Sequence, residues 1–378
     1  MRNSTAIICE LNPIHPGHRH LLKLAGATFS PIIAVVGGNF TQRGEAALWD
    51  AYVRARSAVL CGADLALLLP YPWCAAGAED FARGGAAVAA GVGADSLTFG
   101  SESGDLAGLE KAAALRASEA FGERYRAAES SGRTRGSAAV YEEVMRTLGG
   151  PDTLGPNDKL GLEYIRFGRA AGIGAFHPIR RLDGLPSASE IRDVLRTAPD
   201  GWEAASDLVA AEARELFEAA PRCEPARYEA LLYTHALLFV GGDETSSILR
   251  YAAKAARQTT DPGEFMRALP TKKYTAARMR RELLRSVIDG GTFESEAMAK
   301  TDPRWTVLLA ANARGRAYLA GNRDRFRIPV VVKPADLSAL DEEAKRQNAL
   351  NRRADEVYAY LAGLPVDTYV KMKPAMED

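Results

Sequence analysis

The chain has 378 residues, of which 47% are hydrophobic and 25% are charged. This composition is ordinary for a soluble globular protein, and it excludes a disordered chain, a collagen and a small disulfide scaffold. The 48 Lys plus Arg residues balance the 48 Asp plus Glu residues, so the net charge is zero. Net charge therefore gives no argument for a nucleic-acid partner, although a basic face within a neutral total stays open.

The cysteines and the apolar segments indicate the compartment. The four cysteines form no Cys-x-x-Cys pair and have no histidine at zinc-finger spacing, so we expect reduced, buried thiols. Residues 1–11 lack the basic region and long apolar run of a signal peptide. The most apolar window, residues 65–78, is too short to span a bilayer and contains two prolines. We therefore expect a cytoplasmic protein with no membrane partner.

Short apolar runs alternate with helix-compatible stretches over the first hundred residues. The runs predict strands at Thr5–Cys9, Ile32–Val36, Asp64–Leu69 and Asp95–Phe99. The stretches between them predict helices at Gly17–Ala27, Glu45–Cys61 and Gly77–Ala90. This alternation predicts an α/β fold with a Rossmann-like, doubly wound parallel sheet and right-handed crossovers. Ligands of such sheets bind beyond the carboxyl ends of the strands, so the loops there are the first candidates for a site.

The next segment is predicted to be mainly helical and to return to the sheet once. Residues 105–172 have helical patterns that are broken at Ser130–Gly136 and Gly149–Pro156. A fifth strand is predicted at Gly174–Ile179, followed by a helix that begins near Ser187.

The pattern changes after residue 200. From Trp202 onward, apolar residues recur every three to four positions, which predicts mainly helices, with one late strand at Ile328–Val332. We therefore predict a nucleotide-binding catalytic α/β domain over residues 1–200 and a mainly helical domain over residues 201–378.

The loop after the first strand, ELNPIHPGH from Glu10 to His18, ends where a helix is predicted to begin. A helix N-terminus presents unpaired N–H groups and a partial positive charge, which suits a phosphate. Gly17 has no Cβ, so the backbone can approach a ligand closely. His15 and His18 are three residues apart and face the same way on the first turn. Two imidazole donors aimed at an α-phosphate would stabilise the charge that develops there during nucleotidyl transfer.

Two other interpretations of this loop stay open. His15 and His18 could bind a metal ion, although no third ligand is evident and the chain has only five histidines. The loop could also be a plain turn, since Asn-Pro and Pro-Gly are turn dipeptides. Its place after the first strand of an alternating domain favours the phosphate site.

A second motif, Ser187-Ala-Ser189-Glu190-Ile-Arg192, opens the helix after the fifth strand. Ser187 and Glu190 fit a capping box, which is the simplest interpretation of the segment. Arg192, one turn into the helix, could instead pair with β- or γ-phosphate oxygens. Together, the two motifs resemble the HxGH and "STxIR" motifs of the adenylate-forming nucleotidyltransferase superfamily.

Further segments narrow the resemblance. In chain order they are Gly38–Glu45 (GNFTQRGE), Gly62–Asp64, Leu69–Pro70, Phe99–Glu102, Pro156–Gly161, Ile179–Arg181 and Thr271–Thr275, followed by Arg278, Arg280 and Arg281. This ordered set resembles the bacterial tRNA(Met) cytidine acetate ligase family over most of the chain. Gly38–Glu45 is its most specific piece.

The resemblance implies a two-step reaction. ATP and acetate would give acetyl-adenylate and pyrophosphate, and the acetyl group would then pass to the N4 amine of the wobble cytidine in elongator tRNA(Met). Acetate is a poor electrophile and its mixed anhydride with AMP is a good one, which the weakly nucleophilic cytidine amine needs together with close positioning. Mg²⁺ is expected with ATP, but the sequence identifies no carboxylate as its ligand, and no protein-held metal is predicted.

The family's functional positions map onto this sequence motif by motif. His15 and His18 match the catalytic pair. The ATP-binding positions implied are Cys9, Glu10, Leu11, Asn12, Pro13, His15, Gly17, His18, His20, Gly100, Asn157, Arg181, Ser187, Ser189 and Arg192. Alternatively, Gly100 is a tight turn at a strand end and Asn157 is a helix cap beside Pro156.

The acceptor side is predicted in the helical segment. Residues 266–327 hold 14 Lys plus Arg against 6 Asp plus Glu, a local excess of +8. The predicted tRNA-binding residues are Lys272, Lys273, Tyr274, Arg278, Arg281 and Arg285, the three arginines at helical spacing on one face. The alternative is a solvated helix face with ordinary salt bridges.

Three departures from the family pattern leave the acid and the acceptor RNA open. Ala51-Tyr52 stands where relatives commonly have Lys-Trp, Leu68 stands where they have an acidic residue, and only Leu182–Pro186 remains of a longer segment before the Ser motif. We expect none of the three to touch the HxGH loop. Two other functions stay open: a small-molecule nucleotidyltransferase acting on a phosphorylated metabolite, and a non-catalytic nucleotide- or RNA-binding module.

Overall fold

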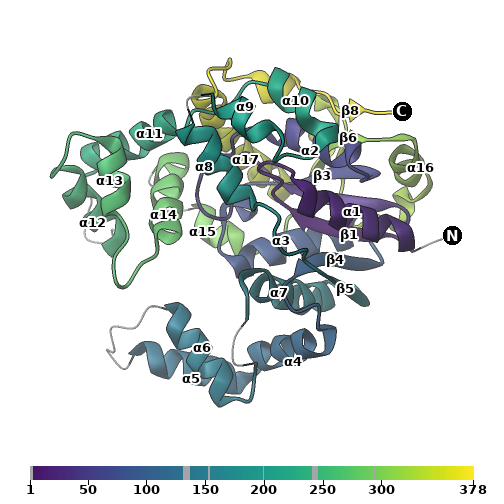
Figure 1. Cartoon of the computed structure of the whole chain (residues 1–378), viewed down its shortest axis with the longest axis horizontal. Coiled ribbons are helices and arrows are strands. Elements are labelled where there is room, and N and C mark those ends of the chain that lie inside the picture. The colour runs from purple at the N-terminus through teal and green to yellow at the C-terminus, as the bar shows by residue number, and fades with distance from the viewer. Residues whose placement is uncertain are drawn as a thin grey trace.

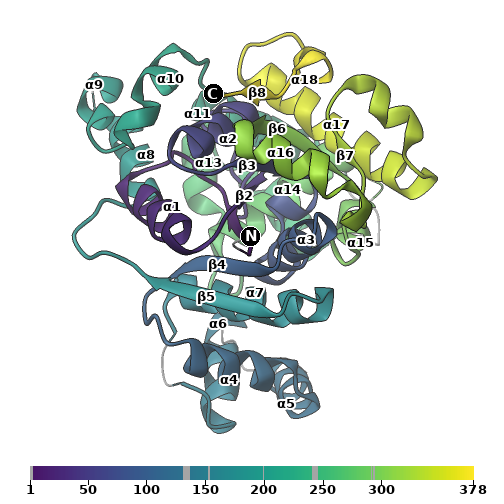
Figure 2. The same ribbon diagram turned by 90° about the vertical axis from the view of Figure 1, so that its right-hand side faces the viewer.

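The computed structural model of the chain describes residues 3–130, 137–151, 154–198, 200–240, 246–290, 292 and 294–378. A central sheet crosses the molecule with strand order β5-β4-β1-β2-β3-β6-β7, and β8 pairs with β6 (Figures 1 and 2). The strands are β1 (Thr5–Cys9), β2 (Ile32–Gly37), β3 (Leu65–Leu69), β4 (Ser96–Ser101), β5 (Ala175–Arg180), β6 (Thr306–Ala311), β7 (Val330–Val331) and β8 (Ala375–Met376). Strands β1 to β5 are parallel, which confirms the predicted doubly wound α/β fold.

Helices surround this sheet. They are α1 (Pro16–Thr28), α2 (Ala51–Leu60), α3 (Ala78–Gly91), α4 (Leu106–Ala117), α5 (Glu119–Ser130), α6 (Ser137–Thr147), α7 (Pro156–Ala171), α8 (Ala188–Thr197), α9 (Gly201–Ser206), α10 (Arg214–Ala219), α11 (Pro225–Leu238), α12 (Ser247–Ala256), α13 (Pro262–Ala268), α14 (Ala276–Asp289), α15 (Glu294–Ala299), α16 (Ala313–Gly321), α17 (Glu342–Leu361) and α18 (Thr368–Lys371). Within the described ranges, none of them is long and apolar enough to cross a bilayer.

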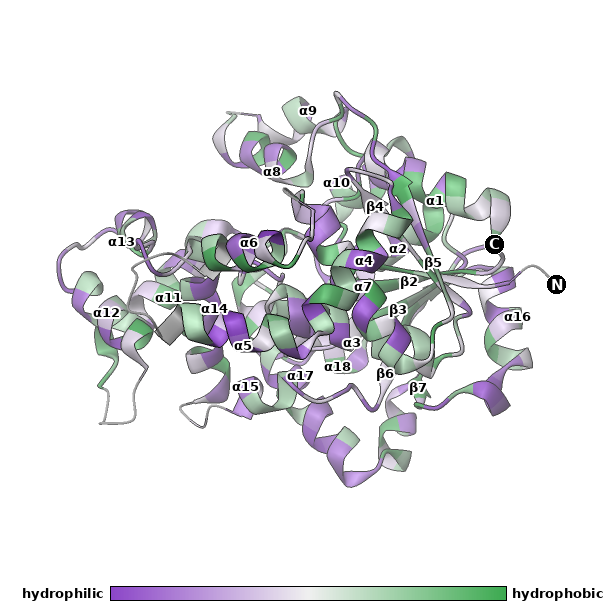
Figure 3. Cartoon of the chain, turned by 90° about the horizontal axis from the view of Figure 1, so that it is seen from below, coloured by the Kyte–Doolittle hydropathy of each residue, from purple (hydrophilic) through white to green (hydrophobic). Residues whose placement is uncertain are grey.

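Both faces of the sheet are covered, because successive side chains of a strand point to opposite faces. On β2, Ile33 and Val35 belong to the core that α3 and α7 complete. Ala34 and Val36 belong to the core beneath α1 and α2. Figure 3 shows β2 and β3 in the colour of hydrophobic residues. Burial on both faces explains why these strands are continuous apolar runs.

The predicted elements and the observed ones differ at several places. The expected helix over Glu45–Cys61 begins only at Ala51, because Asp50 caps it by accepting a hydrogen bond from Val53 N at 2.9 Å. The break at Gly149–Pro156 is confirmed between α6 and α7, apart from residues 152 and 153, which lie outside the described residues. So do residues 131–136 of the other expected break.

The C-terminal third returns to the sheet. The expected late strand is the short β7, but β6 and β8 are not predicted from the sequence. β6 pairs antiparallel with β3, and β8 pairs parallel with β6. The division into domains at residue 200 stays a prediction, and the second of the two segments supplies three strands to the common sheet. The four cysteines are free thiols, three of them buried and Cys9 half-buried.

Candidate nucleotide site

A cleft opens where the sheet order changes direction, between β1 and β4. Loops that leave neighbouring strands on opposite sides of such a point make a crevice at the carboxyl edge. The cleft is lined by Cys9 and Glu10 after β1, by His15, Gly17, His18 and His20 of the HxGH segment, by Gln42 and Arg43 after β2, by Gly100 on β4, by Asn157 on α7, and by Arg181 after β5. Nine of the predicted ATP-site residues therefore meet in one place.

The other six predicted residues lie elsewhere. Leu11, Asn12 and Pro13 belong to the same loop as His15 but are buried. Asn12 Oδ1 accepts a hydrogen bond from Leu48 N at 2.9 Å, so its side chain supports the loop. Ser187, Ser189 and Arg192 do not line this cleft either, and the last two line a neighbouring cleft between α8 and α14.

His15 is the N-cap of α1. Its Nδ1 accepts a hydrogen bond from Gly17 N at 3.1 Å. His15 N in turn donates to Nδ1 of His18 at 3.4 Å, and the two rings lie 3.9 Å apart between centroids. When the imidazoles are neutral, each Nδ1 is thus occupied as an acceptor, and Nε2 carries the proton. The helix N-terminus therefore holds two neutral Nε2–H donors.

The protonation of these histidines follows from their surroundings. Burial and, to a smaller extent, the positive charge of Arg181 together lower the pKa of His15 to about 4. Burial, His15 and Arg181 together hold the pKa of His18 well below its ordinary value. Both rings are consequently neutral at pH 7, where they can act as hydrogen-bond donors without carrying charge.

The structure gives a different reason for a glycine at position 17 from the close approach of a ligand that the sequence suggests. A Cβ at this position would stand 2.9 Å from His15 Cε1 and 3.1 Å from His15 Nδ1. The absence of a side chain therefore makes room for the His15 ring itself. At Gly100 a Cβ would meet only Arg181 Cγ, at 3.8 Å, so neighbouring protein atoms do not require glycine there.

Arg54 on α2 holds the loops of the cleft in place. Its side chain is fully buried. The guanidinium donates to the backbone oxygens of Trp49 at 2.8 Å, Gly37 at 2.9 Å and Gly38 at 2.6 Å, and also to that of Glu10. A buried charge satisfied by carbonyls of two loops fixes both of them. Nothing in the local pattern distinguishes this arginine from a surface residue of α2.

Glu102 and Asp158 fix the β4 side of the cleft. The N-cap of α7 is Gly155, so Asn157 is not the cap considered from the sequence. Asn157 instead donates from Nδ2 to Glu102 Oε1 at 2.6 Å. Glu102 belongs to the matched Phe99–Glu102 segment, but the sequence indicates no partner for it, and Asp158 is likewise missed.

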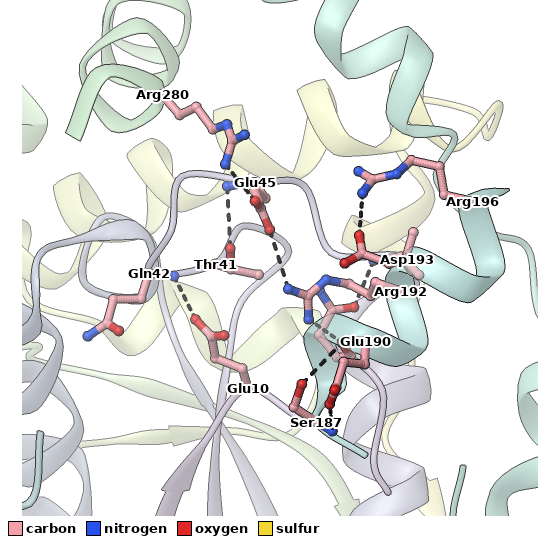
Figure 4. A network of polar contacts seen from close by, with 12 residues as sticks. Glu10, Thr41, Gln42, Glu45, Ser187, Glu190, Arg192, Asp193, Arg196 and Arg280 are labelled. Carbon is pink, nitrogen blue, oxygen red and sulfur yellow. Dashed lines mark hydrogen bonds and ion pairs between the residues drawn. The ribbon is translucent and has the colours of Figure 1, made fainter. Parts of the chain in front are cut away.

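The Ser motif is a capping box. Ser187 Oγ accepts from Glu190 N at 3.3 Å, and Ser187 N donates to Glu190 Oε2 at 2.6 Å, which confirms the simpler interpretation. Arg192 donates from Nη1 to Asn12 O at 2.9 Å and pairs with Glu45 at 3.7 Å (Figure 4). The Arg192 side chain therefore binds the backbone of the HxGH loop and a carboxylate, and its contact with phosphate stays a prediction.

The predicted RNA-contacting residues divide into two groups around α14. Lys272, Lys273 and Arg278 are exposed. Lys273 Nζ lies 5.2 Å and Arg278 Cζ 5.0 Å from the ring centroid of Tyr274. Two cations over the half-buried ring of Tyr274, with Lys272 exposed two residues before it, form an arrangement that suits an RNA backbone and an unstacked base.

Arg281 and Arg285 form the second group. They line a cleft between α14 and the start of α3 together with acidic residues. Arg281 donates from Nη1 to Gln42 O at 2.8 Å, and burial lowers its pKa to about 10. Arg285 pairs with Glu282 at 3.9 Å. These two arginines have partners within the protein, so the alternative of ordinary salt bridges fits them better.

Two of the three departures from the family pattern meet in one cavity. Ala51, Tyr52 and Leu68 line an apolar cavity together with Trp305 of the segment leading into β6. The expectation that no departure touches the HxGH loop is wrong for the third: Leu182 and Leu185 line the HxGH cleft. They do so because the segment follows β5, whose carboxyl end lies at the same edge of the sheet as that of β4.

A family model described as HIGH Nucleotidyl Transferase matches residues 2–369, so the chain belongs to this class of proteins. A tRNA(Met) cytidine acetate ligase of Syntrophotalea carbinolica is 32% identical, over 96% of this chain and 91% of that protein. One of Lactobacillus delbrueckii subsp. bulgaricus is 30% identical, over 94% and 95%. The chain belongs to the tRNA(Met) cytidine acetate ligase family.

A solved structure supports the fold. The crystal structure of Thermotoga maritima TmcAL bound with alpha-thio ATP matches with a TM-score of 0.88 at 23% identity, covering 99% of both chains. The two proteins therefore share the same fold over almost their whole lengths. Within the described residues, no group of three or more His, Cys, Asp or Glu side chains is placed to hold a metal ion.

Proposed function

We propose that this chain is an ATP-dependent ligase that activates acetate as acetyl-adenylate and transfers the acetyl group to the N4 amine of the wobble cytidine of elongator tRNA(Met). The observation that carries the proposal is the pair of neutral imidazoles at the N-terminus of α1, each with Nδ1 occupied by a backbone amide. Family membership supplies the reaction, and the curated relatives bear that name.

The first step needs a stabilised pentavalent phosphorus. An acetate oxygen attacks the α-phosphorus of ATP, and the bond to the β-phosphate oxygen breaks as pyrophosphate leaves. The Nε2–H groups of His15 and His18 would donate to the oxygens on which negative charge accumulates. Because both rings are neutral before the reaction, they donate hydrogen bonds without transferring a proton.

The second step needs positioning more than acid–base strength. The cytidine N4 attacks the acetyl carbon, the amine loses one proton, and AMP leaves with the bonding electrons. The chain would hold the RNA through the exposed group Lys272, Lys273, Tyr274 and Arg278. Bringing two bound substrates together at one edge of the sheet supplies the effective concentration that a weak nucleophile needs.

Mg²⁺ would accompany ATP. Among the described residues that line the cleft, Glu10 supplies the one carboxylate. Its Oε1 accepts from Gln42 N at 2.6 Å. Magnesium keeps several waters and binds substrate phosphates readily, so a single carboxylate at this edge is compatible with a metal held mainly by the triphosphate.

The test is ATP–pyrophosphate exchange with and without acetate, in the absence of RNA. We expect acetate-dependent exchange, and its loss in His18→Ala with the melting temperature unchanged within a few degrees. Acetylation of an elongator tRNA(Met) transcript then tests the acceptor. Exchange that needs a phosphorylated metabolite instead of acetate would indicate a small-molecule nucleotidyltransferase, and ATP binding without any exchange would indicate a non-catalytic module.

A further inference from the structure

One carboxylate joins α8 and α14, the two helices that flank the cleft beside the nucleotide cleft. Glu45 ends the Gly38–Glu45 loop after β2. Its Oε1 accepts from Arg280 Nη1 of α14 at 2.7 Å, and its Oε2 pairs with Arg192 Nη2 of α8 at 3.7 Å. Figure 4 shows Glu45 between the two arginines. Each carboxylate oxygen therefore contacts an arginine of a different helix.

The loop that presents Glu45 is held rigidly. Thr41 N donates to Glu45 O at 2.9 Å, and Gly44 N donates to Thr41 O at 2.8 Å, which closes a tight turn. Gly44 has a φ of +69°, and a Cβ there would stand 2.6 Å from Arg281 N. The buried hydroxyl of Tyr228 donates to Gly44 O at 2.6 Å. Backbone thus packs directly on backbone, so the turn and α14 form one unit.

Each partner of Glu45 leads to a different substrate site. Arg192 donates from Nη1 to Asn12 O at 2.9 Å, in the loop that carries His15. Arg280 lies on α14, two residues after the exposed Arg278. The same loop also reaches the cleft directly, because Gln42 N donates to Glu10 at 2.6 Å. Continuous contacts therefore run from the nucleotide cleft to the helix predicted to contact RNA.

The charges of Glu45 and its two arginine partners indicate the role of the carboxylate between α8 and α14. The side chains of Glu45, Arg192 and Arg280 are 30%, 18% and 26% exposed, so solvent screens them only in part. Without the Glu45 carboxylate, the two guanidinium groups would line the same cleft with Asp193, which pairs with Arg196, and Glu229 as the carboxylates left in its lining. Like charges in a partly buried site repel, and the two helices would separate.

We infer that Glu45 is a positioning residue for both substrates, holding α8 against the nucleotide loop and α14 at a fixed place beside it. The inference rests on the proposed function, in which α14 contacts tRNA. Because Glu45 acts through the arginines, its removal affects ATP and RNA together, whereas loss of Arg280 affects RNA alone.

The experiment measures equilibrium affinity for ATP and for elongator tRNA(Met) in the full-length protein, so neither readout needs turnover. For Glu45→Gln we expect both affinities to fall by about five-fold or more. Arg280→Gln is expected to weaken tRNA binding by a similar factor with ATP affinity changed less than about two-fold. Glu45→Asp, which keeps the charge, should recover part of both losses.

Two further variants make the test specific. Glu229→Gln removes another carboxylate that lines the same cleft from α11, and both affinities should stay at wild-type values. In Glu45→Gln/Arg280→Gln the second change should weaken tRNA binding by less than about two-fold, because the ion pair between Glu45 and Arg280 is already lost in Glu45→Gln. Loss of only one affinity in Glu45→Gln, no loss of either, or equal losses in Glu229→Gln would overturn the inference. Failure of the wild type to catalyse acetate-dependent exchange would instead count against the proposed function.

Discussion

Glu102 and Asp158 each bind the backbone amide of the other. Asp158 N donates to Glu102 Oε2 at 2.8 Å, and Glu102 N donates to Asp158 Oδ1 at 3.1 Å. Glu102 lies just beyond β4, and Asp158 lies in the first turn of α7, where the helix dipole favours a carboxylate. The pair therefore ties a strand end to a helix start, and Gly100 and Asn157 enter the nucleotide cleft from those two segments.

Asp158→Ala should destabilise the fold and loosen this edge of the cleft. Asp158 is 3% exposed and accepts from the Ser101 hydroxyl, from Glu102 N and from Ser103 N. Leaving two backbone amides without acceptors should lower the free energy of unfolding by about 2–3 kcal/mol, measured by urea denaturation. The KM for ATP should rise as well.

The control for Asp158 lies in the same loop. Asp105 is the exposed N-cap of α4 and accepts from Gly108 N at 3.1 Å. Asp105→Ala should cost about 1 kcal/mol as the loss of a cap, with the KM for ATP unchanged. Equal effects of the two variants on KM would show that the reciprocal pair has no special part in shaping the cleft.

Gly17→Ala should disable the site without unfolding the protein. The added Cβ would press on the His15 ring, whose nearest atom is 2.9 Å away, and the ring must turn to accommodate it. Misplacing one phosphate donor should slow ATP–pyrophosphate exchange by about 100-fold. Gly26→Ala, in the same helix with no atom within 4 Å of the new Cβ, should keep full exchange and add about 0.5–1 kcal/mol of stability. Full exchange in Gly17→Ala would refute the role of the His15 ring position.

The parts of this structure that the sequence predicts are those with a local signal. β2 and β3 are apolar runs because they are buried on both faces. The HxGH loop is recognisable because its glycine, histidines and helix start are neighbours in the chain. These features need no knowledge of distant segments.

The unpredicted parts depend on partners far away in the chain. In the sequence, β6 is one more apolar stretch within a mainly helical segment, and only its pairing with the distant β3 makes it a strand. The local sequence is compatible with an ordinary loop at Glu45 and with an ordinary helix face at Arg192. Neither segment indicates that the two side chains form an ion pair. Arg281 looks like one member of a basic face, yet it donates to a carbonyl after β2. Periodicity along one helix gives no information about such pairings.

RNA affinity should depend on the exposed cations and much less on the partnered ones. Lys272→Ala/Lys273→Ala removes two charges beside Tyr274, so the slope of log affinity against log salt should fall by about 1.5. Arg285→Gln, whose guanidinium pairs with Glu282, should leave that slope within error of the wild type. Filter binding with elongator tRNA(Met) over a salt series measures both. A larger change for Arg285→Gln would place the RNA in the cleft beside α3.

Stability should fall on acidification, with part of the loss due to His15. Burial lowers its pKa from the ordinary 6.5 to about 4. Between these two values the unfolded chain binds a proton that the folded protein does not, so the stabilisation is complete above pH 6.5 and is lost as the pH falls toward 4. His15 contributes up to about 1.4 kcal/mol per pH unit inside this window.

His15→Asn isolates this contribution, because an asparagine oxygen can still accept from Gly17 N as the N-cap of α1. The two stability curves are first aligned at pH 4, which removes any constant difference between the proteins. From there to pH 6.5 the free energy of unfolding of the variant should rise less than that of the wild type. Urea denaturation at half-unit pH intervals measures the difference in slope. The slope that remains includes His18, whose pKa is also lowered by burial. Parallel stability curves for the two proteins would mean that His15 titrates normally in the folded state, and its proposed role as a permanently neutral donor would fail with that result.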